Sequence, residues 1–303
     1  MIHKVTKVIR EHPEWLRSKD SVLSFMKVSM PTSGTVFDKG LGKVIIFVFE
    51  QGQTTPTICI KTVREYRARE VIRRNYNNLK LLSAGVSGSA FESLFVSPLY
   101  LYDDGNDIFC VESVCPGVML SAQAGGADLV IEKYMLWQAH LAQTASRFLS
   151  SQDMMEYVNT SMEALKLPEI ATNTLRKYLK RFPMSTNVRL PVLVQHGDMT
   201  PDNVLIEGDN ICLVDYDYVG VNILAGFDLF NFLSKSSHQR QSLRAACSLY
   251  FPRYFESIGA TTETYDNLLF IYYLEECNRK WLRGVDTRGD EIIGSFETLM
   301  NRK

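Results

Sequence analysis

The segments that favour strands and those that favour helices occupy different parts of this 303-residue chain. Runs of β-branched and aromatic residues predict three strands before residue 115, at 44–49, 57–63 and 107–114. Apolar residues at helical spacing predict one helix in the first part of the chain, on Ile72, Tyr76, Leu79 and Leu82. The same spacing predicts helices at 129–148, at 163–182 and again after Phe227. A parallel sheet built from βαβ units would alternate the two kinds of element along the whole chain. The pattern therefore predicts an α+β fold, with a strand-rich part at 1–115 and a mainly helical part at 116–303.

Composition excludes several classes of protein. The 33 Lys and Arg residues nearly balance the 34 Asp and Glu residues, so the chain has no overall attraction for nucleic acid or an anionic membrane. Its longest apolar run, at 268–274, is far shorter than the roughly 20 residues of a membrane span. The first residues lack the apolar stretch of a signal peptide, and the six cysteines contain no C-x-x-C pair. We expect a cytoplasmic protein with neither a nucleic-acid nor a membrane partner.

A short predicted hairpin within the helical part contains the residues of greatest chemical interest. Its strands, 204–206 and 211–214, are joined by a Glu-Gly-Asp-Asn turn. Folding the hairpin brings Asn203, just before the first strand, beside Asp215, just after the second. Amide and carboxylate oxygens are ligands that Mg²⁺ prefers. Asp198, on the loop that enters the same end, could accept a proton from a hydroxyl while the metal neutralises phosphate charge.

Each of these polar residues taken alone could be an ordinary turn or cap former. Together, His-x-Asp-x-x-x-x-Asn followed by a hairpin and Asp is a specific arrangement, which favours the chemical interpretation. The segments 196–203, His-Gly-Asp-x-x-x-x-Asn, and 214–217, Val-Asp-Tyr-Asp, resemble the signature of the aminoglycoside phosphotransferase and choline kinase-like families, relatives of the protein kinases. The stretch 218–229 also resembles the segment that follows in choline and ethanolamine kinases.

The resemblance implies a two-lobed, protein kinase-like fold. The N-terminal lobe, residues 1–115, would be an antiparallel sheet with one main helix and would bind the nucleotide. The C-terminal lobe, residues 116–303, would be mainly helical, contain the catalytic hairpin and bind the substrate. The implied reaction is transfer of the γ-phosphate of ATP, with Mg²⁺ as cofactor, to a hydroxyl of a small molecule.

In the C-terminal lobe the resemblance implies a role for each polar residue of the motif. Asp198 would be the catalytic base, and Asn203 and Asp215 would be Mg²⁺ ligands. His196 would brace the catalytic loop. Two further aspartates would be structural or bind substrate, namely Asp217 and Asp228. Asp228 would tie the following helix to the catalytic loop, with an ordinary helix N-cap as an equal alternative.

The N-terminal lobe fits the same plan. Lys61 would be the lysine that binds the phosphates, although a lone lysine on a strand is usually just solvated. The segment from Glu112 to Val114 resembles the hinge, whose backbone groups hydrogen-bond adenine. The alternative is an ordinary strand that ends in a turn. Gly34 and Gly42 belong to a glycine-rich, basic loop before the first predicted strand, which would cover the phosphates but is not G-x-G-x-x-G.

One departure from the family concerns the helix after the lysine. The family usually has a glutamate there that pairs with the lysine, and this chain has Asn75. Glu65 lies seven residues before Ile72, which places it about 20° away around a helix and on the same stripe. Glu65 would therefore pair with Lys61, provided that the helix begins that early.

The acceptor has two candidate classes. A sugar or an amino alcohol such as choline or ethanolamine is favoured by the stretch 215–228. A quaternary amine would need an aromatic cage, which could be formed by Tyr272, Tyr273 and Trp281. These residues could instead simply belong to the core of a helix. An aminoglycoside is the alternative, because residues 190–303 carry 10 Lys and Arg against 16 Asp and Glu. Its cation site would include Glu275 and Glu276. Both residues could equally well be ordinary solvated carboxylates on a helix surface.

A third interpretation lies outside enzymology. The replacement of the expected glutamate by Asn75 would suit a nucleotide-binding pseudokinase or regulatory module. The presence of the three motif residues Asp198, Asn203 and Asp215 argues for the enzyme instead.

Overall fold

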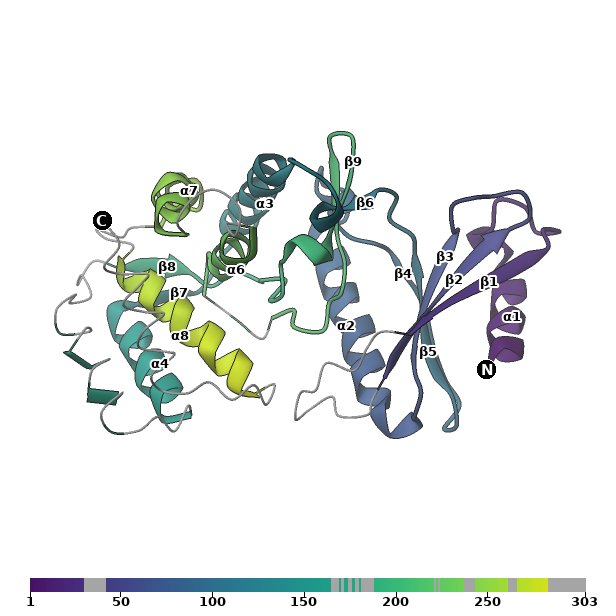
Figure 1. Ribbon diagram of the computed structural model, residues 1–303, viewed down its shortest axis with the longest axis horizontal. Helices are drawn as coiled ribbons and strands as arrows, with labels where there is room; N and C mark the ends of the chain where they lie inside the picture. Colours follow the sequence, from purple (N-terminus) through teal and green to yellow (C-terminus); the bar gives the residue numbers. More distant parts are fainter. Residues whose placement is uncertain are drawn as a thin grey trace. The chain divides into compact units, whose positions relative to one another are not determined.

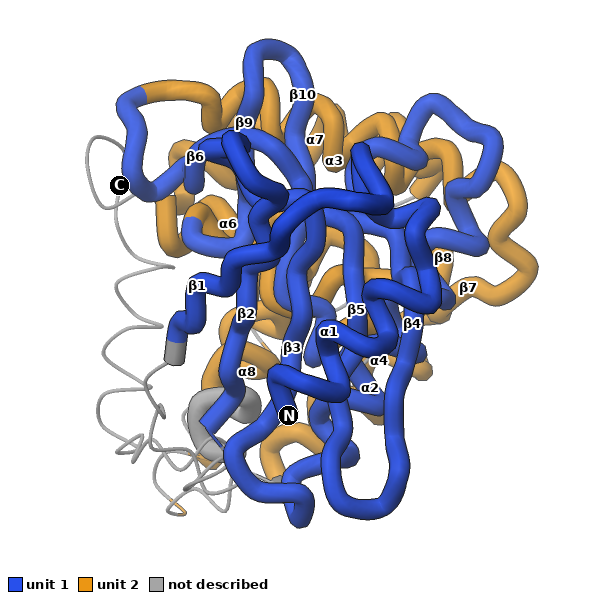
Figure 2. The backbone as a smooth tube through the Cα atoms, turned by 90° about the vertical axis from the view of Figure 1, so that its right-hand side faces the viewer, with its two compact units in different colours: residues 1–34, 38–124, 202–217 blue, residues 35–37, 125–201, 218–303 orange. Residues whose placement is uncertain are grey.

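The computed structural model describes residues 1–29, 42–164, 169, 172–173, 176–177, 180, 188–220, 222, 224–236, 243–260 and 266–282. The chain forms two compact units that interleave along the sequence (Figure 2). Unit 1 comprises residues 1–34, 38–124 and 202–217, and unit 2 comprises 35–37, 125–201 and 218–303. Unit 1 thus extends beyond residue 115 and includes the hairpin, whereas the division into lobes at residue 115 stays a prediction.

Unit 1 is built on a five-stranded sheet in the order β1-β2-β3-β5-β4, in which every neighbouring pair is antiparallel. Its strands are β1 (Leu23–Ser29), β2 (Lys43–Glu50), β3 (Ile58–Val63), β4 (Pro98–Asp103) and β5 (Ile108–Ser113). The predicted strands at 44–49, 57–63 and 107–114 correspond to β2, β3 and β5. The strands β1 and β4 were not predicted from the sequence. β1 has few buried side chains because it lies at the sheet edge, so its alternating pattern is weak.

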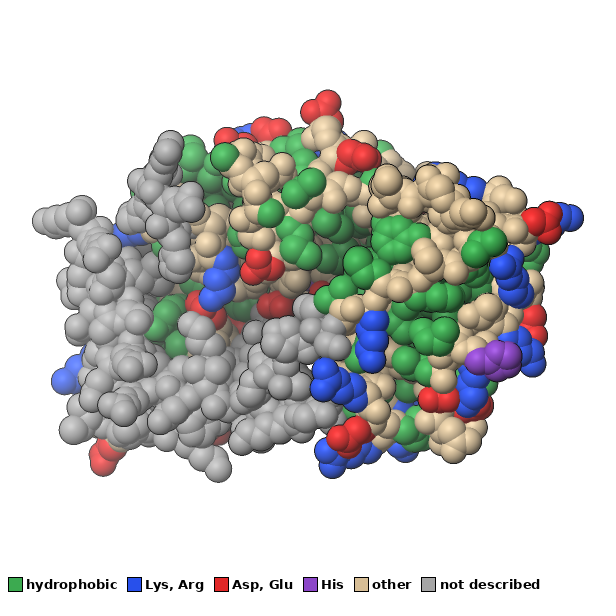
Figure 3. All heavy atoms as spheres, turned by 45° about the vertical axis from the view of Figure 1, so that its right-hand side comes forward, with side chains coloured by type: hydrophobic (Ala, Val, Ile, Leu, Met, Phe, Trp, Pro, Cys, Tyr) green, Lys and Arg blue, Asp and Glu red, His purple; other side chains and the backbone are tan. Residues whose placement is uncertain are grey.

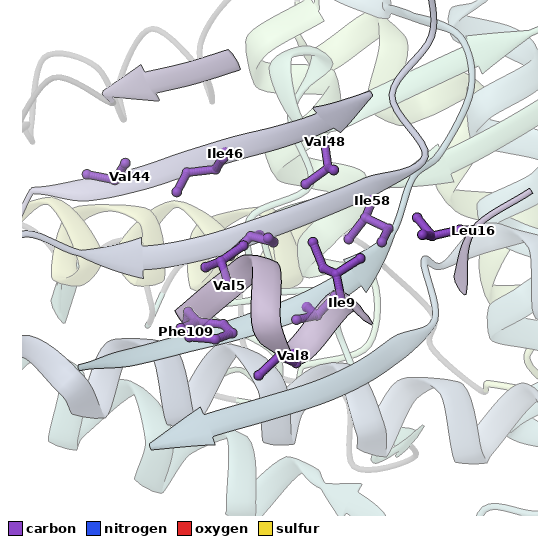
Figure 4. Packing of buried hydrophobic residues seen from close by; sticks show 11 residues of the cluster. Val5, Val8, Ile9, Leu16, Val44, Ile46, Val48, Ile58 and Phe109 are labelled. Atoms are coloured by element: carbon purple, nitrogen blue, oxygen red, sulfur yellow. The ribbon is translucent and has the colours of Figure 1, made fainter. Parts of the chain in front are cut away.

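Two helices cover opposite faces of this sheet (Figure 1). Helix α1 (Ile2–Glu11) places Val5, Val8 and Ile9 on one face, where they pack against apolar residues of β2, β3 and β5 (Figure 4). Helix α2 (Arg69–Val86) covers the other face, and its buried side chains recur at helical spacing as predicted. Because helices cover both faces, all six residues of β3 are buried, including Lys61.

The hairpin is formed by β9 (Val204–Glu207) and β10 (Asn210–Leu213), as predicted. A short strand, β6 (Val118–Met119), pairs with β9 and completes a three-stranded sheet in unit 1. Five short 3-10 helices lie in the described part of the chain: Pro13–Trp15, Tyr66–Ala68, Glu92–Leu94, Leu120–Ala122 and Pro201–Asn203.

Unit 2 is mainly helical. Its helices are α3 (Ala127–Ala142), α4 (Ser151–Ala164), α6 (Phe227–Ser236), α7 (Leu243–Ser257) and α8 (Asp266–Leu282), with a two-stranded sheet of β7 (Phe148–Ser150) and β8 (Arg189–Pro191). Helix α6 contacts α3, α7 and α8, and its residues 227–233 are all buried. The α+β character predicted from the sequence is thereby confirmed.

Of two helices predicted in unit 2, one is shorter than predicted and the other lies mostly outside the described residues. The helix expected at 129–148 ends at Ala142, because Phe148 is extended and pairs with Pro191 in the β7–β8 sheet. Most of the helix expected at 163–182 lies outside the described residues. Helix α4, which precedes it, was not predicted.

On the face drawn in Figure 3, acidic and basic side chains of the described residues are interspersed. No helix within the described ranges is both long and apolar enough to cross a bilayer.

Glu50, the last residue of β2, holds the segment that leads into β1. Its side chain is only 3% exposed and accepts hydrogen bonds from the backbone N–H groups of Arg17 and Ser18 and from the hydroxyls of Ser21 and Thr57. Burial opposes ionisation, but these donors outweigh it and lower the pKa of Glu50 from 4.5 to about 2.

We expect this carboxylate to make the stability of the protein sensitive to acid. Because the folded-state pKa is the lower one, the contribution is complete above pH 4.5 and is lost as the pH falls towards 2. Glu50→Gln should lower the free energy of unfolding by on the order of 2 kcal/mol at pH 7, and the difference from wild type should shrink by about half at pH 3. Urea unfolding at both pH values measures this. The exposed Glu11→Gln is the control, and an equal loss for Glu50→Gln at both pH values would contradict the assignment.

Candidate active site

The open end of the hairpin brings together the residues expected to bind metal. Val204 pairs with Leu213, and one step further the Val214 N–H donates to the Asn203 carbonyl at 3.0 Å. Asn203 and Asp215 therefore lie at the same end, as the hairpin prediction required. Asp215 has a φ of +69° and is the one non-glycine residue with positive φ in the described part of the chain. Such strained residues concentrate at functional sites.

Lys43, at the start of β2, is an unpredicted member of this group. Its Nζ lies 2.8 Å from Oδ1 of Asp215 and 2.5 Å from Oδ2 of Asp217. Burial alone would lower the pKa of Lys43, but the two carboxylates outweigh it and raise that pKa. The pKa of Asp217 is raised, mainly because its carboxyl is buried. Both aspartates thus converge on one cation. Lys43 lies in the glycine-rich, basic segment before the Val44 strand, where no single lysine was predicted to take part in the site.

The donors at this place suit Mg²⁺. Within the described ranges no group of three or more His, Cys, Asp or Glu residues could hold a metal by itself. Two carboxylates and an amide provide hard oxygen ligands, and Mg²⁺ keeps several waters in its coordination shell. Oδ1 of Asp217 is buried and has no hydrogen-bond partner in the structure, so it is an oxygen that a bound cation would satisfy. Asp215, Asp217 and Asn203 therefore fit the metal.

Lys61 lies in a second buried group of unit 1. Its Nζ is 2.9 Å from Oε2 of Glu112, 3.4 Å from Oδ1 of Asn75 and 5.2 Å from the ring centroid of Tyr216. Burial opposes the charge of the ammonium, but Glu112 outweighs it and the pKa of Lys61 is raised. Lys61 is therefore charged, buried and paired, and it is not the ordinary solvated lysine that was the alternative interpretation.

The expected partner of Lys61 was wrong. Helix α2 begins at Arg69, so Glu65 precedes it in extended backbone and does not share the helical stripe of Ile72. The exposed carboxylate of Glu65 pairs with Arg67 instead.

Strand β5 contributes a side chain that the prediction did not include. Glu112 was expected to use backbone groups towards adenine, and its buried side chain is the counter-ion of Lys61. The N–H of Ser113 already donates to Ser97 at 2.9 Å. A nucleotide-binding role for the backbone of Glu112 and of Val114, which follows the strand, stays a prediction.

The phosphate loop can be followed only at its end. Gly34 lies outside the described residues. Gly42 has a φ of +28°, and its carbonyl accepts the Arg64 N–H at 3.2 Å, next to the first pair of β2 with β3. Its part in binding phosphates stays a prediction.

In unit 2, helix α6 holds the loop that contains Asp198. The Asp228 carboxylate is fully buried and accepts the backbone N–H groups of His196 at 2.6 Å and Gly197 at 2.9 Å. One turn later, Asn231 donates to the Met199 carbonyl at 3.2 Å. Asp228 thus ties the helix to the loop. Asn231 was missed, although its spacing of three from Asp228 places both on one face.

Within this loop, Asp198 is the residue left partly accessible. His196, Gly197 and Met199 are buried, whereas Asp198 is half-buried. The Asp198 N–H donates to Nδ1 of His196 at 3.4 Å, so the imidazole braces the loop from within. Asp198 is therefore a partly exposed residue on a backbone that these hydrogen bonds hold in place.

A buried polar network supports the start of the loop and was not predicted. The side chain of Gln195 accepts from the Tyr134 hydroxyl at 2.8 Å and donates to Gln138 at 2.6 Å. Gln138 in turn donates to the Val194 carbonyl at 3.1 Å. Tyr134 and Gln138 are four residues apart on α3, and this spacing, which places them on one face of the helix, was the signal available in the sequence.

Gly197 is required by a close approach. Its φ is +81°, and a Cβ at this position would lie 2.1 Å from the Tyr218 carbonyl oxygen. We expect Gly197→Ala to lower the free energy of unfolding by about 2–4 kcal/mol, because both the backbone conformation and the contact are lost. Gly208 has a φ of +58° with nothing within 4 Å, so Gly208→Ala should cost only about 1 kcal/mol. Equal losses in urea unfolding would show that the contact with Tyr218 carries no weight.

The residues proposed to recognise the acceptor are mostly engaged elsewhere. Tyr272 is fully buried, donates to the Ala225 carbonyl and packs against Phe230, so it belongs to the core and not to a cage. Glu275 is buried and accepts from the Tyr157 hydroxyl, and Glu276 pairs with Lys235 at 3.4 Å. Tyr273 is half-buried, and the side chain of Trp281 lies outside the described residues.

Known proteins resemble this chain in the sequence pattern of one segment and in fold. Residues 132–258 match the model of the APH family, described as a phosphotransferase enzyme family. A putative aminoglycoside phosphotransferase from Ralstonia eutropha is similar in structure at 14% identity, over 99% of this chain and 95% of that one, with a TM-score of 0.58. The GDP complex of an aminoglycoside 2'-phosphotransferase-IIIa variant is similar at 13% identity, over 99% and 96% of the two chains, with a TM-score of 0.55. A comparison with curated protein sequences gives no significant match.

These likenesses show that the chain has the kinase-like fold of the phosphotransferases, as the resemblance implied. The matched segment includes both the loop with Asp198 and the hairpin. Residues 132–258 therefore carry the sequence pattern of the APH phosphotransferase enzyme family, and the resemblance drawn from the motif is confirmed.

Proposed function

We propose that the protein is an ATP- and Mg²⁺-dependent kinase of a small hydroxylated molecule. The observation that carries the proposal is the loop from His196 to Met199, which lies in the segment matched by the phosphotransferase family. Asp228 and Asn231 hold its backbone, and Asp198 is the acid left partly accessible on it. A fixed, accessible carboxylate is what a general base for a hydroxyl requires.

The residues divide the work of an in-line transfer. The acceptor hydroxyl oxygen forms a bond to the γ-phosphorus, the bond from that phosphorus to the β–γ bridging oxygen breaks, and ADP leaves. Asp198 takes the hydroxyl proton, and Lys61 binds phosphate oxygens with its charge. Asp215, Asp217 and Asn203 would hold Mg²⁺, which supplies charge neutralisation for the phosphates.

For the acceptor we propose a sugar or an amino alcohol, with choline and ethanolamine among the compounds to test. Support comes from the stretch 215–228 and its resemblance to choline and ethanolamine kinases. The cage that a quaternary amine would need has lost Tyr272 to the core, which favours neutral sugars and primary amines within this class.

An aminoglycoside is the second candidate. The solved relatives whose names say aminoglycoside phosphotransferase support it, as does the excess of acidic residues over 190–303. Glu275 and Glu276 already have partners, so other carboxylates would have to provide its cation site.

Coupled ADP release tests the proposal. Purified protein is given Mg-ATP or Mg-GTP with hexoses, amino sugars, choline, ethanolamine and kanamycin-like compounds, and acceptor-dependent release is measured against Asp198→Asn. Both nucleotides are included because one solved relative was obtained with GDP. Nucleotide binding without ADP release for any acceptor would favour the alternative of a nucleotide-binding pseudokinase or regulatory module.

A cytoplasmic location stays part of the proposal, and fractionation of cells tests it.

A further inference from the structure

Lys61 has its carboxylate partner on a neighbouring strand of the sheet. Strands β3 and β5 are antiparallel, and Lys61 lies opposite Cys110. Glu112 is two residues further along β5, so its side chain shares the face of Cys110 and lies diagonally from Lys61. Diagonal neighbours are within reach of long side chains, and Nζ and Oε2 are 2.9 Å apart. The sheet register itself therefore forms the ion pair.

Helix α2 contributes an amide where a carboxylate was expected. Asn75 is fully buried, and its Nδ2 donates to Oε1 of Glu112 at 2.6 Å. Its Oδ1 accepts from Nζ of Lys61 at 3.4 Å. The amide can donate to the carboxylate and accept from the ammonium at once, which a second carboxylate could not do. Each oxygen of Glu112 thus has its own partner, and the buried pair is satisfied.

We infer that Glu112 is the positioning residue for the phosphate-binding lysine, with Asn75 as the bridge that fixes it. The inference rests on the proposed function, in which Lys61 binds nucleotide phosphates. Asn75 is then a compensated exchange and no sign of a lost activity, because the carboxylate has moved from the helix to β5.

The position of the carboxylate has a consequence for regulation. In protein kinases the pair joins a strand to a movable helix, and the position of that helix controls activity. Here both members lie on strands that are hydrogen-bonded to each other. The pair therefore forms whenever the sheet is folded, and movement of α2 would not break the link between Lys61 and Glu112. Glu112 is also the first residue of the predicted adenine-binding backbone, residues 112–114, so one segment of the chain would serve both ends of the nucleotide.

An exchange of the two residues tests the inference. Glu112→Gln should weaken binding of Mg-ATP, measured by calorimetry, and raise its KM by about tenfold or more, because Lys61 loses its ionised partner. The KM of the acceptor should stay unchanged. Adding Asn75→Glu to Glu112→Gln returns a carboxylate within reach of Lys61 and should restore nucleotide affinity to within about threefold of wild type. Asn75→Glu alone opposes two carboxylates and should lower the thermal unfolding midpoint.

The controls separate this inference from the proposed function. Glu70→Gln changes an exposed glutamate of helix α2, the helix that contains Asn75, and this variant should bind nucleotide like wild type. If Glu112→Gln also binds like wild type, the inference is overturned and the proposed function stands. If the wild type binds no nucleotide, the proposed function fails. If Glu112→Gln does not fold, the exchanged double variant decides: wild-type affinity supports the inference, and folded protein without affinity overturns it.

Discussion

Asp198→Asn is expected to lower kcat by about 10³-fold while nucleotide affinity stays within about twofold of wild type. The amide has nearly the shape of the carboxylate, so the loop held by Asp228 and Asn231 should keep its conformation. An amide cannot accept the hydroxyl proton, and an effect confined to kcat marks an interaction made in the transition state. Steady-state ADP release and calorimetry of Mg-ATP binding measure the two quantities.

Asp202 provides the matched control for this prediction. It lies four residues later in the same segment and is exposed, so Asp202→Asn should leave kcat within about twofold of wild type. Equal losses in the two variants would point to a general disturbance of the segment. Retention of activity in Asp198→Asn would remove Asp198 from the role of base and with it the proposed mechanism.

Asp228→Ala is expected to lower the free energy of unfolding by about 4 kcal/mol and to abolish activity. The carboxylate is fully buried, and its removal leaves the N–H groups of His196 and Gly197 without their acceptor. A buried, unsatisfied donor costs about 1–3 kcal/mol. Asp228→Asn keeps one acceptor oxygen and should cost about half as much. Urea unfolding of the three proteins gives the series.

The control is another aspartate in the first turn of a helix. Asp153 of α4 accepts from the backbone N–H and the hydroxyl of Ser150, but it is exposed. Asp153→Ala should therefore cost about 1 kcal/mol, the usual value of a cap. If Asp228→Ala costs no more than Asp153→Ala, then Asp228 is an ordinary cap, and the link between α6 and the catalytic loop contributes little.

Local patterns were sufficient for much of the fold. The strands β2, β3 and β5 are continuous runs of β-branched and aromatic residues, and the apolar residues of helix α2 recur at helical spacing, so local composition and spacing predicted all four. Strand β1 buries little, and the end of α3 depends on the pairing of Phe148 with Pro191. Neither feature has a local signal strong enough to predict it, because a distant partner decides the conformation.

The candidate site shows the same limit. The hairpin turn was sufficient to bring Asn203 and Asp215 together, because their approach depends only on the pairing of adjacent strands. The partner of Lys61 was wrong for the opposite reason. A helical wheel for Glu65 assumes where the helix begins, whereas Glu112 reaches Lys61 only because β5 lies beside β3 in the sheet.

The sequence by itself thus determined the kinds of element, the hairpin and the phosphotransferase motif, all of which depend on residues close together along the chain. Tertiary structure decided which distant charges meet: Lys43 with Asp215 and Asp217, Lys61 with Glu112, and Asp228 with the backbone before Asp198. The physical reason is that buried charges need partners, and strand order and helix packing place those partners without leaving a periodic trace in the sequence.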